Sequence, residues 1–294
     1  MQTLKPFEYF EPRAIEEAVR ILSMYGEEAK VLAGGVDLVP RMRQHKIKPA
    51  CVVSIQRIPG LDYVEEDSAG LRIGALTTLG SIELSPVIQK NYVIIYEAIQ
   101  GIASTQVKNM GTAVGNLCVG TPASDMAPPL SVLDAKLKIV STVSERIISI
   151  EKFFIGVNQT VLQPDEIVTE ILLPSASARI GSSFLKLVRT AGDIAKINVA
   201  VAVTITNNTF KEAKVALGSV APTLIRAKKA EETLRGKKLD QRVIETAARV
   251  AAEEVRPITD IRSTAEYRKE VTTVLVRRAL EKAVERAKAS SRRK

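Results

Sequence analysis

The sequence predicts an α+β protein of two domains, or of one large domain and a smaller one, and three observations lead to this prediction. The chain has 294 residues, which is more than one average domain. Before residue 174, short strands and helices alternate around glycine turns. After residue 178, an antiparallel series of strands is followed by three helices.

The first segment, residues 1–58, is predicted to form a helix, a strand, a turn, a second helix and a second strand. Apolar residues recur at helical spacing after Pro12, and Gly26 suits the position just beyond the helix end. A short buried strand, Lys30–Leu32, then leads into a glycine turn. We expect Asp37 to be the N-cap of the next short helix, and Cys51–Ile55 to be the second buried strand.

The second segment, residues 59–174, is predicted to hold a hairpin, an amphipathic helix, a glycine-rich stretch and further strands. The hairpin turns at Asp67–Gly70, and the glycine-rich stretch covers Gln106–Asn116. The helix carries its apolar residues on one side, namely Ile94, Ile95, Ala98, Ile99 and Ile102. The strands are expected at Leu61–Val64, Leu71–Leu76, Ala135–Val140 and Ile167–Leu173.

The segment Pro174–Ala178 is the best candidate for a linker, because it consists of a proline and small residues. Beyond it we expect an antiparallel meander with Asn207 and Asn208 at one turn. The strands of this meander are predicted at Ser183–Val188, Val199–Ile205 and Glu212–Leu217. The three helices are expected near Leu224–Arg235, Gln241–Glu254 and Ala265–Lys288.

The composition excludes several kinds of reactive centre within this chain. His45 is the only histidine, and Cys51 and Cys118 are the only cysteines. A zinc site of Cys and His ligands, or an iron–sulfur cluster on four cysteines, therefore cannot form here. A catalytic Ser-His-Asp arrangement would have to use His45. If the protein is an enzyme, we expect a bound cofactor or a partner chain to supply its reactive centre.

The sequence also predicts a cytoplasmic protein. Its first residues lack the apolar region of a signal peptide, and no apolar run is long enough to span a membrane. The low number of cysteines fits a reducing compartment.

The formal net charge of +9 favours anionic partners, and much of the excess lies in residues 277–294. Three interpretations of this basic stretch are open: a solvated helix face with a frayed tail, a docking patch for a partner subunit, and a nucleic-acid site. No nucleic-acid recognition motif accompanies the charge, so the solvated helix face is favoured.

Two glycine loops are the candidate binding elements. The first, Val31–Asp37, connects a strand to a helix, and the second, Gly111–Asn116, adds a threonine hydroxyl and an asparagine amide. Glycines let a ligand approach the backbone N–H groups, so two such loops suit a pyrophosphate held between two subdomains. Neither loop matches the Rossmann fingerprint or the P-loop. The alternative is a pair of unrelated turns without a ligand.

A series of motifs runs through the chain. The first part contains Ala33-Gly34-Gly35-x-Asp37-Leu38, Gln106-Val107-Lys108-Asn109-x-Gly111-Thr112-x-x-Gly115-Asn116 and Pro122-x-x-Asp125. The second part contains Phe184-x-Lys186-x-x-Arg189-x-x-x-Asp193-Ile194-Ala195, Gly218-Ser219-Val220-Ala221-Pro222 with Arg226 and Glu231, and Asp260-x-Arg262-Ser263-x-x-Tyr267-Arg268. Together they closely resemble the FAD-binding medium subunits of molybdenum hydroxylases, a family that includes xanthine dehydrogenase, carbon monoxide dehydrogenase and aldehyde oxidoreductases.

The resemblance implies a vanillyl-alcohol-oxidase-type (PCMH-type) FAD-binding domain of two subdomains, residues 1–58 and 59–174. A C-terminal α+β domain with a small antiparallel sheet, residues 179–290, would follow. It also implies an oxidoreductase subunit with noncovalent FAD, which carries electrons from [2Fe–2S] clusters on a small subunit to an external acceptor. A large molybdopterin subunit would hydroxylate the substrate. We expect a dimer of such heterotrimers, with no membrane span and no nucleic acid.

The resemblance also assigns cofactor contacts residue by residue. The backbone of Leu32–Val36, with Asp37 behind it, should hold the pyrophosphate from one side, and Thr112 and Gly115 from the other. Asn116 should fix the loop or the polar edge of the flavin. The complete expected set is Val31, Leu32, Ala33, Gly34, Gly35, Val36, Asp37, Ile102, Thr112, Val114, Gly115, Asn116, Thr121, Asp125, Ile167, Val168 and Lys186.

Within this set, Asp125 is expected to hydrogen-bond the sugar-like chain of the flavin. Lys186 should lie near the carbonyls of the isoalloxazine ring. Ile102 would pack on a flavin face, while Ile167 and Val168 would offer backbone contacts to the adenine. For these three apolar residues, ordinary core packing is an equal alternative. The resemblance implies neither a catalytic side chain nor a metal ligand in this chain.

Two residues depart from the pattern of the family. Val114 stands where the family usually has glycine or another small residue. Because a β-branched side chain disfavours positive φ, we expect this loop to follow a different path. Val36 replaces a residue that is often polar, so we expect one side-chain hydrogen bond to phosphate to be absent.

Two other functions stay open at this point. One is a free-standing flavoenzyme that oxidises its own substrate, and the other is a basic scaffold or nucleic-acid-binding protein. Flavin bands in the visible spectrum would favour a flavoprotein over the scaffold. The substrate is left open among aldehydes, carbon monoxide, purines and aromatic thioesters, because its pocket would lie in the large subunit.

Overall fold

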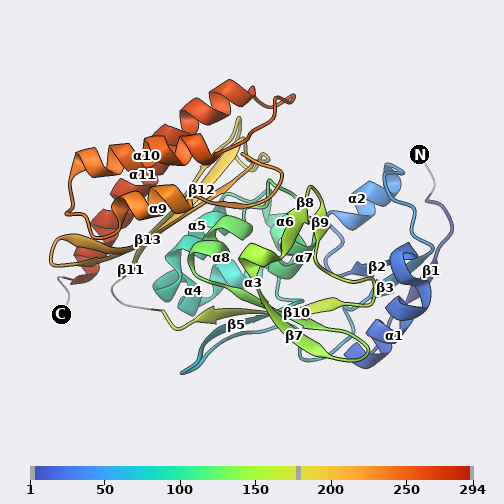
Figure 1. The fold of residues 1–294 in the computed structure, drawn as a ribbon. Coiled ribbons are helices and arrows are strands. Elements are labelled where there is room, and N and C mark those ends of the chain that lie inside the picture. Colours follow the sequence, from blue (N-terminus) through green and yellow to red (C-terminus); the bar gives the residue numbers. More distant parts are fainter. Residues whose placement is uncertain (1–3, 177–179, 292–294) are drawn as a thin grey trace.

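The computed structural model describes residues 4–176 and 180–291 (Figure 1). Three larger sheets follow one another along the described chain, each with helices packed against it. In Figure 1 the first sheet lies at one end of the molecule and the C-terminal helices lie at the other. Ser177 and Ala178, which belong to the expected linker, lie outside the described residues.

The first sheet is parallel, with the strand order β1-β3-β2. α1 packs its buried face against this sheet and ends at Gly26, which has a φ of 54°. The expected helix and both expected strands are confirmed, whereas β1 was not expected because its three residues show no periodicity. The elements are β1 (Glu8–Phe10), α1 (Ile15–Tyr25), η1 (Gly26–Glu28), β2 (Ala29–Leu32), α2 (Leu38–Arg43) and β3 (Cys51–Ser54).

The second sheet is antiparallel, in the order β4-β5-β10-β6-β7, and its central strand β10 is buried along most of its length. The predicted hairpin turn and the later strands are confirmed, but the first hairpin strand is Val64–Glu66, so residues 61–63 of the predicted strand Leu61–Val64 are not part of it. The strands are β4 (Val64–Glu66), β5 (Gly70–Gly74), β6 (Lys136–Val140), β7 (Glu145–Ser149) and β10 (Ile167–Pro174). A separate hairpin, which was not expected, consists of β8 (Phe154–Gly156) and β9 (Gln159–Thr160) after η2 (Ile150–Lys152).

Short helices connect the strands of this second part. The loop expected at Gly111–Asn116 contains the start of α7, because the Thr112 hydroxyl caps this helix, and residues 106–108 before it belong to α6, which the Ser104 hydroxyl caps. The prediction of a loop was therefore wrong. The helices are α3 (Leu79–Leu84), α4 (Pro86–Asn91), α5 (Val93–Gln100), α6 (Thr105–Lys108), α7 (Ala113–Cys118) and α8 (Ala127–Val132).

The third sheet is the predicted antiparallel meander, in the order β11-β12-β13-β14. Asn207 and Asn208 form its turn with φ values of 48° and 56°. The first predicted helix begins later than expected, because Ile225 pairs with Leu217 as part of β14. The elements are β11 (Ile180–Leu187), β12 (Ile197–Thr206), β13 (Thr209–Gly218), β14 (Ile225–Arg226), α9 (Lys228–Leu234), α10 (Gln241–Glu254) and α11 (Ala265–Ser291).

The third sheet is covered on both faces, and strand alternation divides its side chains between two cores. In β12, Val199 and Val201 belong to a core shared with α9, α10 and α11. Ala200 and Ala202, between and beyond them, join the larger core formed by the first two parts of the chain. This opposite face of the sheet packs against α5 and α8, which connects the C-terminal part to the rest of the protein.

The basic C-terminal stretch is more than a solvated helix face. α11 buries one side against β11 and β12, with Leu280 and Ala283 fully enclosed. On another side, Lys282 and Arg286 bind the Glu97 carboxylate of α5 at 2.7 and 2.6 Å. The favoured interpretation was therefore incomplete, because two of these cations attach the C-terminal helix to the rest of the chain.

Candidate functional site

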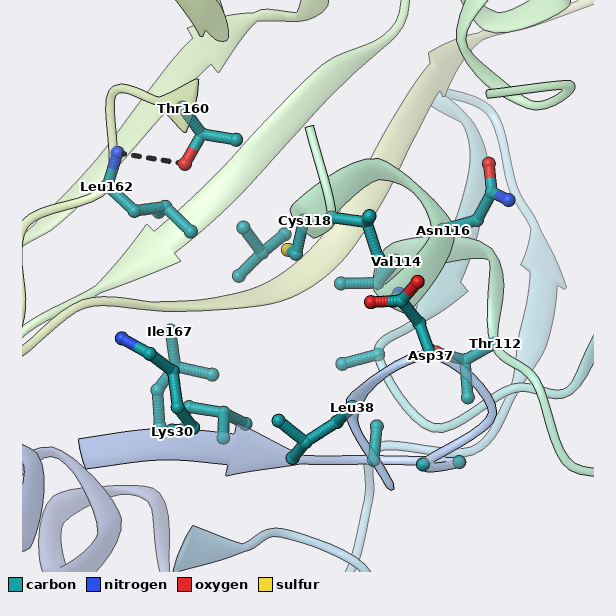
Figure 2. Close-up of a pocket in the computed structure, with 18 of the residues that line it drawn as sticks. Lys30, Asp37, Leu38, Thr112, Val114, Asn116, Cys118, Thr160, Leu162 and Ile167 are labelled. Carbon is teal, nitrogen blue, oxygen red and sulfur yellow. Dashed lines mark hydrogen bonds between the residues drawn. The ribbon is translucent and has the colours of Figure 1, made fainter. Parts of the chain in front are cut away.

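A cavity of about 840 Å³ opens between the first and second parts of the chain (Figure 2). This volume lies in the range of small-molecule and cofactor sites. The residues that line it fall between Leu22 and Val168, so β11–β14 and α9–α11 contribute no lining residue. Figure 2 shows Lys30 and Leu38 on one side and Thr112, Val114, Asn116 and Cys118 on another.

The turn between β2 and α2 forms one wall. Gly35 has a φ of 71°, a conformation that favours glycine. At Gly34, a Cβ would overlap the carbonyl oxygen of Met110, so only glycine lets the two expected loops approach this closely. The Val36 side chain lies against Gly111, which gives this unusual residue an apolar contact between the two loops.

Asp37 occupies the N-cap position of α2, as expected, but its side chain does not cap the helix. Its backbone is helical, with φ −105° and ψ −48°, and its carboxylate pairs with Arg41 at 3.4 Å instead. The expected cap was wrong because this φ/ψ combination differs from the extended conformation that directs an N-cap side chain at the helix N–H groups.

The start of α7 forms the opposite wall. The Thr112 hydroxyl accepts a hydrogen bond from the backbone N–H of Gly115 at 2.9 Å and so caps the helix. Val114 lies inside this helix and has no positive φ, which removes the reason to expect a different path for the loop. The Asn116 side chain accepts a hydrogen bond from Ser124 at 2.6 Å, so it fixes the segment that follows.

The remaining wall comes from the β8–β9 hairpin and the turn before β10, which the sequence analysis missed. In Figure 2, Thr160 and Leu162 lie beside each other, joined by a 3.4 Å hydrogen bond from the Leu162 N–H to the Thr160 hydroxyl. Glu166 also lines the cavity. Burial would raise the pKa of Glu166, but hydrogen bonds from Arg146 and a backbone N–H outweigh it and lower that pKa.

Cys118 is a further lining residue that the sequence analysis did not select. Burial raises the pKa of its thiol to about 12, so the side chain stays protonated and apolar. Its spacing gave a usable signal, since Val114 and Cys118 are four residues apart and therefore share one face of α7.

The structure places most of the predicted site residues on this cavity. Those that line it are Val31, Ala33, Gly34, Gly35, Val36, Asp37, Ile102, Thr112, Val114, Gly115, Asn116, Thr121, Ile167 and Val168. Leu32, Asp125 and Lys186 lie outside the lining set. Leu32 belongs to β2, while Asp125 and Lys186 are bound to each other.

Asp125 and Lys186 form a buried ion pair with a distance of 2.7 Å, and less than a tenth of either side chain is exposed. Lys186 also donates to the carbonyl of Gly101 at 2.9 Å. Asn198 donates to the other carboxylate oxygen of Asp125 at 2.8 Å. Burial raises the pKa of Asp125, and the contacts with Lys186 and Asn198 only partly oppose this shift. Thus one carboxylate joins the second and third parts of the chain.

Among the described residues, no cluster of His, Cys, Asp and Glu side chains is arranged to hold a metal ion. The same part of the chain contains no helix of sufficient length and hydrophobicity to cross a membrane.

Comparisons with known proteins cover nearly the whole chain. Residues 5–176 match the family described as FAD binding domain in molybdopterin dehydrogenase. Residues 182–283 match the CO dehydrogenase flavoprotein C-terminal domain. The carbon monoxide dehydrogenase medium chain of Hydrogenophaga pseudoflava is 34% identical over 93% of this chain and 96% of its own length. The nicotine 6-hydroxylase medium subunit of Paenarthrobacter nicotinovorans is 31% identical over 94% of this chain and 97% of its own length.

Solved structures of similar proteins also match nearly the whole chain. Carbon monoxide dehydrogenase from Hydrogenophaga pseudoflava superposes with a TM-score of 0.94 and 33% identity, covering 97% of this chain and 99% of that chain. Quinoline 2-oxidoreductase from Pseudomonas putida 86 gives a TM-score of 0.91 at 25% identity, with the same coverage. The predicted mixed fold with a small C-terminal antiparallel sheet is therefore confirmed.

Proposed function

Because this chain belongs to the family of FAD-binding medium subunits of molybdenum hydroxylases, we propose that FAD lies in the cavity between the β2–α2 turn and the start of α7. The chain is the FAD-carrying electron-transfer subunit of an oxidoreductase complex, and it functions beside a large and a small subunit. Bound FAD supplies a two-electron centre between iron–sulfur clusters on the partners and an external acceptor.

The residues of the cavity fit this cofactor. The observation that carries the proposal is the close approach of the two loops, in which Gly34 packs against the backbone of Met110 without room for a Cβ. Gly115 is restricted less strongly, because a Cβ there would lie 2.8 Å from a side-chain atom, the Thr112 hydroxyl oxygen. Small residues on both walls leave backbone groups accessible to a pyrophosphate. Among the described residues, only those before residue 169 line the cavity.

The role of each side chain follows from its place. Thr112 holds the first turn of α7, and Asn116 holds the segment that leads to Asp125. We assign Asp125 to the hydroxyl groups of the flavin side chain, because a buried carboxylate with few donors can accept another hydrogen bond. Lys186 places a positive charge beside Asp125, where it would stabilise negative charge on the reduced flavin ring.

We propose that residues 1–58 and 59–174 are two FAD-binding subdomains, and that residues 179–290 are a C-terminal domain. We assign the complex to the cytoplasm, supported by the few cysteines, and expect a dimer of heterotrimers. The substrate is turned over on the large subunit, so a substrate-loaded complex should reduce this flavin through the clusters.

The test of the cofactor site compares three full-length chains. The wild type should bind FAD and show the visible bands of oxidised flavin. Gly34→Ala should lose at least nine tenths of its flavin, since the added methyl must separate the two loops. Gly60→Ala is the control, because Gly60 does not line the cavity and a Cβ there meets no atom within 4 Å, so the variant adds only the backbone strain of a φ of 74°. Equal flavin content in all three chains would contradict this placement of FAD.

A further inference from the structure

Three residues of the C-terminal sheet form one row across neighbouring strands. Lys186 on β11 lies opposite Asn198 on β12, and Asn198 lies opposite Gly218 on β13. Since successive side chains of a strand point to opposite faces, Lys186 and Asn198 share the face that packs against the FAD-binding part. Their neighbours Ile197 and Val199 belong to the core on the other face.

Asn198 uses both hydrogens of its amide nitrogen on the FAD-binding part. The nitrogen donates to the Asp125 carboxylate at 2.8 Å and to the carbonyl of Ser124 at 3.0 Å. Both partners are acceptors only, so the orientation of the amide is determined by its contacts. Asn198 is fully buried, and its side chain thus reaches from the C-terminal domain to a residue of the cofactor site.

The amide oxygen of Asn198 is buried without a hydrogen-bond partner among the described residues. An unpaired buried oxygen is unfavourable, so an apolar side chain would be the simpler choice for this core position. The two donated hydrogen bonds are therefore the physical reason for an asparagine here. Gly218 makes room for it, because a Cβ on Gly218 would overlap that amide oxygen.

Attachment of the two domains alone does not account for Asn198. The segment from Pro122 to Asp125 is already bound to the C-terminal sheet through its backbone. The N–H of Ser219 donates to the carbonyl of Pro122 at 2.7 Å. At a separate junction, Arg286 and Lys282 bind Glu97. What Asn198 adds is a donor aimed at the functional carboxylate of Asp125.

We propose that Asn198 is a positioning residue of the FAD site, which fixes the Asp125 carboxylate and, through the ion pair, the Lys186 ammonium. This inference rests on the proposed function of Asp125 and Lys186 at the flavin. It explains how a C-terminal domain whose described residues do not line the cavity acts on the Asp125–Lys186 ion pair, which itself lies outside the cavity lining.

The first experiment measures the dissociation constant of FAD for the full chain and for Asn198→Leu. Leucine keeps the branched shape and the number of side-chain heavy atoms and removes the two donors, so FAD should bind about tenfold more weakly. Asn198→Ser, whose side chain is too short to reach Asp125, should give the same loss. This second variant maintains the test if Asn198→Leu does not fold.

The second readout separates positioning from general stability. Lys186 is the charged side chain that contacts Asp125 among the described residues, and the Asn198 amide stabilises the ionised carboxylate. Without that amide, the pH midpoint of FAD binding should move upward. In an Asp125→Asn background, replacing Asn198 should change neither the affinity nor the pH profile. Lys282→Met, which removes a cation that binds Glu97 rather than Asp125, should keep wild-type FAD binding.

The outcomes distinguish the two proposals. Wild-type affinity and pH midpoint in both Asn198 variants would overturn the positioning role, while the FAD site itself would stand. An equal loss of affinity in the Asp125→Asn background would also overturn it, because Asn198 would then act independently of Asp125. Failure of the unmodified chain to bind FAD would overturn the proposed function and this inference with it.

Discussion

Two carboxylates, Glu97 and Asp125, connect the FAD-binding part to the C-terminal domain in opposite ways. Glu97 receives hydrogen bonds from Lys282, Arg286 and the N–H of Phe184. Burial would raise the pKa of Glu97, but these donors outweigh it and lower that pKa. Asp125 is more deeply buried, has one cation and one amide, and keeps a raised pKa.

The difference separates an anchor from a binding group. A carboxylate whose acceptor sites are all filled by donors of the protein, such as Glu97, gains no further hydrogen bond from a ligand. A buried carboxylate with too few donors gains when another donor arrives. On this basis, Glu97 serves the attachment of α11 and Asp125 serves the cofactor, although both link the same two parts of the chain.

The largest effect should follow from removal of the anchor. Glu97→Leu leaves Lys282 and Arg286 without their shared partner and should reduce the free energy of unfolding by about 2 kcal/mol. The figure is modest because both cations keep access to water. Urea unfolding of the full chain checks it, with FAD affinity measured in parallel. A strong loss of FAD affinity together with unchanged stability would reverse the roles of the two carboxylates.

Lowering the pH should change the stability contributions of Glu97 and Asp125 in opposite directions. The lowered pKa of Glu97 contributes stability above the ordinary pKa of a glutamate, and this contribution is lost as the pH falls through the lowered value. The raised pKa of Asp125 stabilises the protein without FAD below the ordinary pKa of an aspartate, and this contribution is lost as the pH rises through the raised value.

FAD needs the ionised form of Asp125 in this account, so its affinity should fall about tenfold as the pH drops from about 7 to about 4. In Asp125→Asn, FAD should bind more weakly near pH 7, and this part of the pH dependence should disappear. Titration of FAD binding over that range, with Glu97→Gln as the control, tests the assignment. The same acid-dependent loss in Asp125→Asn would exclude Asp125 as its source.

A smaller effect should follow from loss of the cation at the cofactor site. Lys186→Met should leave FAD bound but lower its midpoint potential by roughly 30 mV, because a partly neutralised ammonium contributes about 1.4 kcal/mol over two electrons. A redox titration measures this shift. Addition of Asp125→Asn should recover part of it, since the unpaired carboxylate is then removed. An unchanged potential in Lys186→Met would mean that the ammonium does not reach the flavin.

The smallest effect is expected for one cation of the anchor. Lys282→Met should cost only about 0.5 kcal/mol of stability, because Lys282 is partly exposed and Arg286 still binds both carboxylate oxygens of Glu97. Thermal unfolding provides the measurement. A loss as large as that of Glu97→Leu would show that the donors at this junction are not redundant.

Much of the fold was predictable because its signals are local. α10 covers the predicted range Gln241–Glu254, and the meander turns at Asn207 and Asn208 as its pattern indicates. Most of the residues that the family resemblance selected also line the cavity. Local signals failed where side-chain direction depends on the backbone, as for Asp37, which occupies the cap position without capping.

Other features depend on contacts between distant segments and have no local signal. The need for glycine at position 34 comes from the backbone of Met110, and the need for glycine at position 218 comes from Asn198 on the neighbouring strand. Asn198 itself resembles any strand residue until the register places it beside Lys186. The β8–β9 hairpin was missed because its strands have three and two residues.

The most direct test of the central claim uses Cys118, a thiol that lines the cavity, with Cys51 as the internal control because it is fully buried in β3. The two cysteines of the chain can be followed separately by peptide mass after alkylation. The measurement is the rate of Cys118 alkylation with and without saturating FAD. The account predicts that FAD slows alkylation of Cys118 at least tenfold and leaves Cys51 unchanged. If FAD binds but Cys118 is alkylated at the same rate, the cofactor lies elsewhere and the account is wrong.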